Sequence, residues 1–426
     1  MKHCIPADLT YPGAVRRVVA SLAALVALAL PGAAASDLNE GPQTILAILV
    51  TWGPQPFAPE ALRTSLFTEA DAFVRSASLG KASLAGDVTP WLPARQFTSC
   101  DPIAISDMGL AALNAARAAG YDTSKYSRYF FAFPRPPQCN FAGYGSGNEV
   151  WLFGTAATPV VTHELGHTFG LGHAWSRACR TCRPVEYGDP YDTMGHGSGD
   201  YNASEKALTG WIDASPVTRN GEYLVDAIEN ASTQPQALVV VTAHNEYWFD
   251  HREPLGPDTA YRDSSIVRGV EVHASPSADD DGTSPYQPGN VLVLNPTGSG
   301  GDAVVPGESW GEAGAFSITV VAHEGTAMRV RFAWTDAKRP TRPPLYSPSA
   351  VVRRAVQVQW GRSHDDGSGL ARYEVRLDGR TAGTTAPDNR ALTLAKPKRG
   401  RHLVSVVAID RAGNRSPAGS KRFVVR

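Results

Sequence analysis

The chain has 426 residues, of which 42% are hydrophobic and 19% are charged, and 40 basic residues nearly balance 41 acidic ones. This length favours two or three domains, and the composition excludes a disordered, collagen-like or membrane-embedded protein. The net charge of −1 gives no reason to expect a nucleic-acid-binding protein.

Residues 1–35 have the pattern of a secretory signal peptide. Arg16 and Arg17 precede an apolar run from Val18 to Leu30, and Ala33-Ala34-Ala35 has the small side chains of a cleavage site. The run is shorter than the about 20 residues that a membrane helix needs, and no later stretch is suited to span a membrane. The sequence therefore predicts a secreted or cell-surface protein, exported by the general or the twin-arginine route.

Strands and helices are predicted to alternate after the signal peptide. Apolar, β-branched or alternating runs predict four strands, at 44–52, 82–92, 129–133 and 148–153. Apolar residues at helical spacing predict helices at 58–78 and 105–119. A third helix is expected to open at Thr158-Pro159, since proline suits the first helical turn. This alternation predicts an α/β domain, which we place at residues 36–213.

The character of the chain changes beyond Trp211. Short β-rich runs alternate with Gly, Pro and Asp turns, and they predict a β-sandwich-like module at 214–336. Residues 337–347 are proline-rich and predict a stiff linker. A separate β module is expected at 348–426, which makes the protein multidomain.

Four cysteines lie outside the signal peptide: Cys100, Cys139, Cys179 and Cys182. Four cysteines in an exported chain fit two disulfides, for which three pairings exist. We favour Cys100–Cys139 with Cys179–Cys182, because the second pair lies in one short loop. A zinc knuckle at the second pair is the alternative, but no further Cys/His pair with suitable spacing completes it.

The sequence HELGHTFGLGH, from His163 to His173, carries the most specific chemistry. On a helix, His163 and His167 are four residues apart, so both rings project from one face and can bind one ion. Gly170 permits the left-handed turn that brings His173 back as a third ligand. Glu164 is placed to take a proton from a metal-bound water. Three imidazoles and one water match a catalytic zinc site, whereas a structural zinc would have a fourth protein ligand.

This spacing resembles that of the metzincin zinc endopeptidases. The resemblance implies a twisted, mostly parallel sheet in the catalytic domain and a methionine turn after the third histidine. Asp192-Thr193-Met194-Gly195 supplies that turn, and by resemblance Met194 forms an apolar floor beneath the zinc ligands. His196 is either a hydrogen-bond donor to the tetrahedral intermediate or, as we favour, a solvent-facing loop residue.

Segments 186–195 and 204–211 resemble the gametolysin family in particular, and segments 247–252 and 269–273 resemble its downstream region. The resemblance covers about residues 44–335 and implies an extracellular endopeptidase that acts on matrix or cell-wall proteins. The expected cleavage site leaves too little chain before the first strand for a cysteine-containing propeptide. Latency through such a cysteine is therefore not expected.

The predicted reaction is peptide-bond hydrolysis by a metal-activated water, with Glu164 as general base and then general acid. An extended protein or peptide substrate is expected to pair with an edge strand at Asn148–Phe153, with Asn148, Val150 and Trp151 at the site. Two alternatives remain open at this point. One is a matrix-binding protein with little activity, and the other is a zinc peptidase of peptidoglycan.

Residues 348–426 resemble a fibronectin type III domain, on the alternating run that ends at Trp360 and the turn from Asp410 to Asn414. From Lys338 onward there are 19 basic and 6 acidic residues. This excess predicts contact with an acidic polymer or cell surface, or only a solvated face.

Two further motifs have ordinary explanations. Asp279-Asp280-Asp281-Gly282 can hold Ca²⁺, but it lacks the spaced ligands of a defined loop, so an exposed acidic turn is favoured. Asn202-Ala203-Ser204 matches a glycosylation acceptor. Since Glu205 follows three residues after Asn202, we favour a helix cap there.

Overall fold

The structure is a computed structural model that describes residues 39–179, 182–276, 287, 289–353, 355–395 and 397–426. The predicted signal peptide and the acidic turn at 279–282 lie outside the described residues. The chain divides into two compact units, residues 1–75 with 80–170 and residues 76–79 with 171–426, and each is described by itself. Within the described ranges, no helix is both long and apolar enough to cross a membrane.

The first unit is built around one sheet. Its strands are β1 (Gly41–Thr51), β2 (Ala82–Val88), β3 (Leu92–Pro93), β4 (Arg128–Phe133), β5 (Gly143–Ser146) and β6 (Glu149–Phe153). The order is β2-β1-β4-β6-β5, with β3 also paired to β1. All pairs are parallel except β5 with β6. The sheet is therefore mostly parallel, and Ile45 to Val50 of β1 are fully buried, as expected for a central strand covered on both faces.

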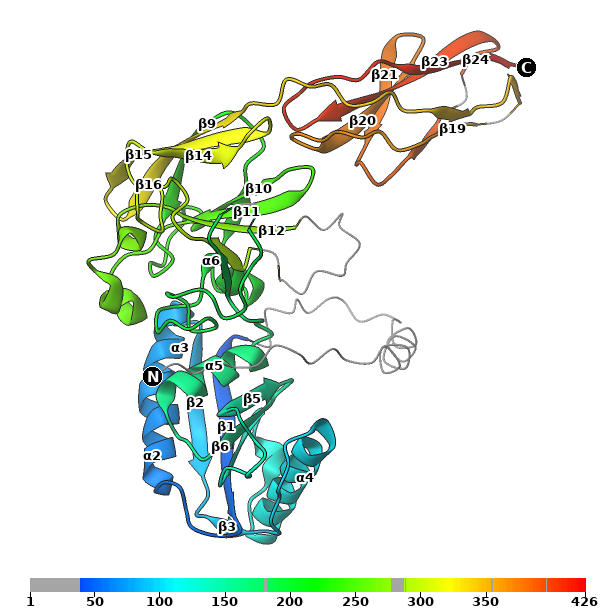
Figure 1. Cartoon of the computed structure of the whole chain (residues 1–426). Helices are drawn as coiled ribbons and strands as arrows, with labels where there is room; N and C mark the ends of the chain where they lie inside the picture. Colours follow the sequence, from blue (N-terminus) through cyan, green and yellow to red (C-terminus); the bar gives the residue numbers. More distant parts are fainter. Residues whose placement is uncertain (1–38, 180–181, 277–286, 288, 354, 396) are drawn as a thin grey trace. The chain divides into compact units, whose positions relative to one another are not determined.

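Helices cover this sheet. They are α2 (Pro59–Thr64), the π-helical η3 (Ser65–Ala70), α3 (Asp71–Ala77), α4 (Pro102–Ala118), the 3₁₀ turn η4 (Thr123–Lys125) and α5 (Thr158–Thr168). The predicted helix at 58–78 corresponds to α2, η3 and α3 in succession. Met108, Ala112 and Ala116 of α4 share an apolar core with alternate residues of β1, and Figure 1 shows α2 and α4 on opposite sides of the sheet.

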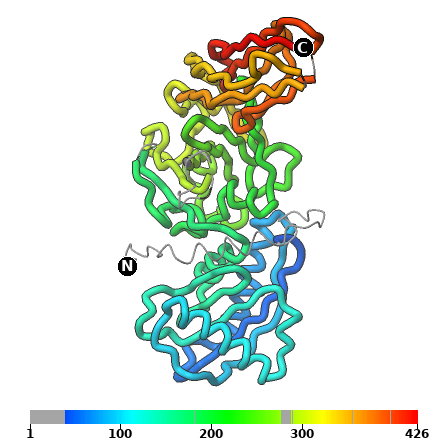
Figure 2. Tube along the Cα trace, turned by 90° about the vertical axis from the view of Figure 1, so that its right-hand side faces the viewer, coloured from blue at the N-terminus to red at the C-terminus, as the bar shows by residue number. Residues whose placement is uncertain are grey.

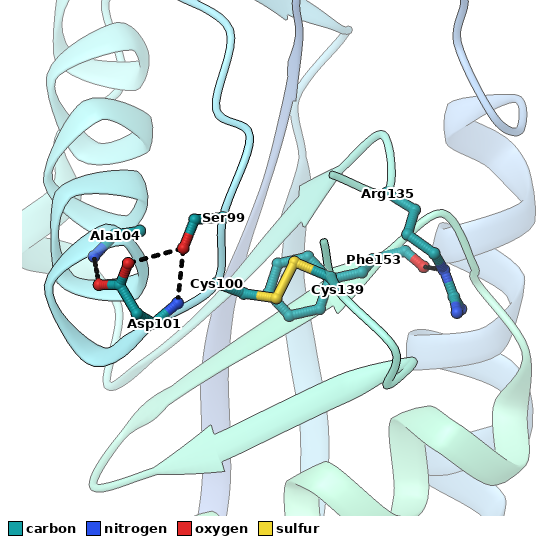
Figure 3. The surroundings of a disulfide bond; sticks show 7 residues. All are labelled: Ser99, Cys100, Asp101, Ala104, Arg135, Cys139 and Phe153. Atoms are coloured by element: carbon teal, nitrogen blue, oxygen red, sulfur yellow. Dashed lines mark hydrogen bonds between the residues drawn. A yellow bond between two sulfur atoms is a disulfide. The ribbon is translucent and has the colours of Figure 1, made fainter. Parts of the chain in front are cut away.

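The start of α4 is held by a cap and a disulfide (Figure 3). The Asp101 carboxylate accepts hydrogen bonds from the backbone N–H groups of Ile103 and Ala104, both at 3.0 Å. The adjacent Cys100 is bonded to Cys139. In the second unit, Cys179 is bonded to Cys182. Both favoured pairings are therefore present in the structure.

The prediction that Asn148–Phe153 forms the sheet edge is wrong. β6 pairs with β4 on one side and with β5 on the other, so it has no free edge. Val150 and Trp151 are buried within the sheet, and Asn148 lies in the turn before β6. The edge strand is β5, which the sequence did not reveal because Gly-Tyr-Gly-Ser is short, half glycine and without an apolar pattern.

The second unit begins with two sheets that share a core. The elements are β7 (Trp175–Arg177), α6 (Ala203–Leu208), β8 (Ala214–Pro216), β9 (Gly221–Asp226), β10 (Ala237–Val241), β11 (Asn245–Asp250), η5 (Gly256–Tyr261), η6 (Ser265–Val267), β12 (Glu271–Pro276), β13 (Val291–Val293), β14 (Ser309–Glu312), β15 (Phe316–Glu324) and β16 (Ala327–Trp334). One sheet has the order β7-β13-β12-β11-β10-β8 and the other β14-β15-β16-β9. Tyr247 and Phe249 from the first sheet pack with Phe316 and Phe332 from the second. This arrangement is sandwich-like.

Residues 345–425 form two further sheets, coloured orange to red in Figure 2. Their strands are β17 (Leu345–Ser347), β18 (Val351–Val352), β19 (Val356–Trp360), β20 (Leu370–Leu377), β21 (Arg380–Thr385), β22 (Ala391–Leu394), β23 (Gly400–Asp410) and β24 (Gly419–Val425). The orders are β17-β19-β22 and β18-β24-β23-β20-β21. Trp360 and Tyr373, one from each sheet, lie in a common core. The Tyr373 hydroxyl accepts a hydrogen bond from Ser363 N at 2.8 Å.

Candidate functional site

Helix α5 carries the first part of the predicted site. It begins at Thr158 with Pro159 in its first turn, as the sequence predicts. His163 and His167 lie one turn apart, with ring centroids 5.0 Å apart and planes at 87°. The two imidazoles therefore share one face of the helix, which is what the four-residue spacing requires.

The helix ends in a turn that polar contacts hold in place. Gly170 has φ of +92°, a conformation that glycine adopts without a Cβ clash. Arg128 donates to the Thr168 carbonyl at 2.6 Å, and Asn39 donates to the Phe169 carbonyl at 3.2 Å. These contacts satisfy carbonyl groups that a helix end leaves without partners.

His173 follows three residues after Gly170 and has its own supporting contacts. Its Nδ1 lies 2.7 Å from Oε1 of Glu186, and its ring lies against Tyr187 with centroids 3.9 Å apart. The His173 carbonyl accepts a hydrogen bond from Asn290 at 2.9 Å. A metal-bound histidine commonly donates its second ring N–H to a carboxylate, which leaves Nε2 for the ion. Sequence reasoning gave no role to Glu186, because no local pattern links it to His173.

The three predicted ligands come together. Ligand-capable ring nitrogens of His163, His167 and His173 lie within 4.8 Å of one another. Tetrahedral zinc with bonds of about 2.0–2.1 Å separates its ligand atoms by about 3.3 Å, so small side-chain adjustments suffice to bind one ion. Imidazole is a preferred zinc ligand, and the donor set fits the predicted metal.

Glu164 lies on α5 between the two histidines in sequence, and its side chain is buried, with 7% of the residue exposed. Burial raises the pKa of Glu164 to about 8, and a hydrogen bond from the Gly145 backbone opposes that rise. The positive charge of a bound ion would lower this pKa and favour the carboxylate. Gly143 and Gly145 of β5 face this side chain and the adjoining backbone. The edge strand can lie close to α5 because these two positions have no side chains. No local sequence pattern indicates a role for either glycine.

Met194 occupies a buried turn, fully shielded from solvent. Its carbonyl accepts a hydrogen bond from Ala174 N at 3.0 Å, directly after His173 in the chain. Asp192 accepts from Met194 N at 2.6 Å and from Asn202 N at 2.7 Å. Asn202 in turn caps α6 by accepting from the backbone N–H groups of Ser204 and Glu205, so the predicted helix cap is confirmed.

His196 is exposed, and its Nδ1 lies 2.6 Å from the Tyr187 carbonyl. This position is the one expected if His196 is a solvent-facing loop residue. A role for His196 in stabilising an intermediate stays a prediction.

A buried ionic network adjoins the chain before α6. Arg252 donates to Glu271 at 2.6 Å, to Asp258 at 3.0 Å and to the Asp200 carbonyl at 3.1 Å. Lys206 donates to the Asp200 carboxylate at 2.7 Å. Both cations are fully buried, so each needs a charged partner to offset its lost hydration. No local sequence pattern indicates that these residues meet.

Comparison with solved structures finds likenesses to parts of the chain. The fibronectin(III)-like modules of Clostridium thermocellum CbhA share 23% identity, cover 20% of this chain and 96% of their own, and give a TM-score of 0.19. The Clostridium perfringens spore cortex lytic enzyme SleM shares 16% identity and covers 27% of this chain and 40% of its own, with a TM-score of 0.19. Domains d3–d4 of the rat CD45 extracellular region share 14% identity and cover 27% of this chain and 67% of their own, with a TM-score of 0.19. Scores this low carry no argument about fold or function.

No curated protein matches the chain. A protein-family model does match, that of the gametolysin peptidases M11, over residues 70–246. The matched range contains the three-histidine segment, Glu164 and Met194. Residues 70–246 of this chain are therefore similar to the gametolysin peptidases.

Proposed function

We propose that the protein is a secreted zinc endopeptidase that cleaves extracellular or cell-wall proteins. One observation carries this proposal: three imidazole nitrogens converge beside a buried glutamate, inside a region that matches a peptidase family. Such a set of three neutral ligands leaves a coordination position for water or substrate.

Each residue of the site has its own role in the proposed reaction. His163, His167 and His173 would hold the ion, and Glu186 orients the ring of His173 through Nδ1. When bound, zinc polarises the scissile carbonyl and lowers the pKa of its coordinated water toward ~7. Glu164 would accept a proton from the attacking water and deliver it to the leaving amine. Met194 supports the ligands through the backbone contact with Ala174.

The substrate is proposed to lie extended along β5. Among the described strands, β5 pairs only with β6, so no other strand occupies its outer edge. Gly143 and Gly145 share one face of the strand, since side chains alternate along it. The absence of side chains at these positions lets β5 lie close to Glu164. A peptide added along the outer edge of β5 would therefore lie near the proposed base.

Glu164→Gln is the direct test, because it keeps the side-chain shape and removes the base. The variant should retain zinc in metal analysis and lose nearly all turnover of a peptide library. Glu60→Gln, at an exposed position, is the matched control and should cleave as the parent does. Parental cleavage by Glu164→Gln would disprove the assigned base. Bound zinc without any cleavage by the parent would favour a matrix-binding role instead.

A further inference from the structure

A second group of metal-binding side chains lies in the β-rich part of the second unit. His251 directly follows β11, Glu253 lies two residues further on, and His323 belongs to β15. One ligand atom from each lies within 4.8 Å of the other two. β11 and β15 belong to different sheets, so this group, here called the His251 cluster, joins the two sheets that share the apolar core.

The distances in the His251 cluster are close to those around a bound ion. Nε2 of His251 lies 3.5 Å from Oε1 of Glu253, and Nε2 of His323 lies 3.0 Å from the same oxygen. The two ring centroids are 5.1 Å apart. Tetrahedral zinc with bonds of about 2.0–2.1 Å places its ligand atoms about 3.3 Å apart. The observed separations lie on both sides of that value.

The hydrogen bonds around His251 define which nitrogen is free to coordinate. Its Nδ1 lies 2.8 Å from the Gly269 carbonyl oxygen, which can only accept. Nδ1 therefore carries a proton, which leaves Nε2, on the side of the Glu253 carboxylate, as the nitrogen that can bind an ion. Two acceptors that face each other repel unless a proton or a cation lies between them. A carbonyl acceptor on the remote ring nitrogen is also the usual support of a metal-bound histidine.

Backbone contacts hold the ligands in place. The His251 carbonyl accepts from Ile228 N at 3.0 Å, and Glu253 N donates to the Glu229 carboxylate at 2.9 Å. His323 is fixed by its pairing with Met328 across β15 and β16. The backbone positions of the three residues are thus set by contacts within the two sheets, as a preformed site requires.

Exposure varies across the cluster from buried to open. The side chain of His251 is 0% exposed, that of Glu253 18% and that of His323 39%. An ion can therefore enter from the His323 side, and solvent can supply its fourth ligand there. The ion would then have three protein ligands and one ligand from solvent.

We propose that His251, Glu253 and His323 bind a second divalent transition-metal ion, zinc in the first instance, which links β15 to the end of β11. Imidazole and carboxylate ligands suit zinc and exclude a preference for Ca²⁺, which favours an all-oxygen shell. The ion would lie between Nε2 of His251 and the Glu253 carboxylate. It would thereby stabilise the contact between the two sheets.

Zinc content of the purified full chain tests this proposal. After equilibration with zinc and removal of loosely bound metal, the parent should hold two equivalents, and His323→Ala and Glu253→Gln should each hold one. His244→Ala, at an exposed position outside the cluster, should keep two. His163→Ala should keep one, and the His163→Ala/His323→Ala variant should keep none. Cobalt bound to His163→Ala should give the absorption of a tetrahedral site, and the double variant should not.

The outcomes separate this inference from the proposed peptidase site. If His323→Ala and Glu253→Gln both retain the parental zinc content, the second site does not exist. If His163→Ala leaves no zinc at all, the second site is likewise refuted. If His163→Ala does not change the content while His323→Ala lowers it by one equivalent, the catalytic proposal fails and this one stands. Retained peptidase activity in His323→Ala would show that the variant is folded.

Discussion

Gly143 of the edge strand β5 lies directly against the side chain of Glu164 on α5. A Cβ added at Gly143 would lie 2.6 Å from both Cγ and Oε1 of Glu164. Real Cβ atoms do not approach other atoms so closely, so even one methyl group there must displace the glutamate or the strand. The position of the proposed general base therefore depends on a glycine in a neighbouring strand.

Gly143→Ala is expected to reduce kcat by about 10- to 100-fold, because a misplacement of about 1 Å can cost that much in rate. Zinc content should be unchanged, since the substitution does not touch a ligand. Gly53→Ala serves as the control, because a Cβ at Gly53 would meet nothing within 4 Å. Unaltered kcat in Gly143→Ala would show that Glu164 does not need this close packing.

Glu186→Gln tests the support of His173. The variant keeps an oxygen for the Nδ1 contact of 2.7 Å but loses the negative charge. We expect zinc affinity to fall by roughly 10- to 100-fold, measured by competition with a chelator of known strength. Equal zinc affinity in parent and variant would show that the Glu186 charge does not support metal binding by His173.

His273 should make stability depend on pH. It is buried on β12, 3.4 Å from Asp250, and burial, followed by the charge of Arg252, lowers the pKa of His273 to about 3. The folded chain therefore keeps the ring neutral, while the unfolded chain protonates it below about pH 6.5. Stability is lost as the pH falls from about 6.5 toward 3, by about 1.4 kcal/mol per pH unit from this residue alone.

The contribution of His273 is obtained from a difference between variants, since buried carboxylates also titrate. Urea unfolding at pH 7 and pH 5 should give a smaller loss of unfolding free energy for His273→Gln than for the parent. His364→Gln, at an exposed position, should behave as the parent does. Equal losses in His273→Gln and the parent would mean that the ring is protonated in the folded state.

Trp360 should be a main source of stability in the C-terminal sheets. It is 2% exposed and lies edge-on to Tyr373, with centroids 5.5 Å apart. Trp360→Ala should lower the unfolding free energy of this module by about 3–5 kcal/mol. Calorimetry should show the loss as an earlier transition, whereas Tyr346→Ala, at an exposed position, should leave that transition within a few degrees. An unshifted transition in Trp360→Ala would contradict the core position of this ring.

Local sequence patterns were sufficient to predict much of the candidate site and of the helices and turns that hold it. The four-residue spacing of His163 and His167 predicts the shared helix face, and Gly170 predicts the turn that ends α5. Asn202 with Glu205 predicts the cap of α6. These features depend on residues a few positions apart, whose geometry follows from the backbone of one helix or turn.

Other features depend on contacts between distant parts of the chain. A four-residue strand with two glycines has no periodic signal, so only pairing with β6 identifies β5 as the edge and corrects the prediction for Asn148–Phe153. The pairing of Glu186 with His173 and the meeting of His251 with His323 have no sequence pattern either. The sequence by itself determined which side chains can bind metal and which helix presents the first two. Only the tertiary structure decided which carboxylates and strands lie beside them, because packing brings together residues whose separation along the chain carries no information about their distance in space.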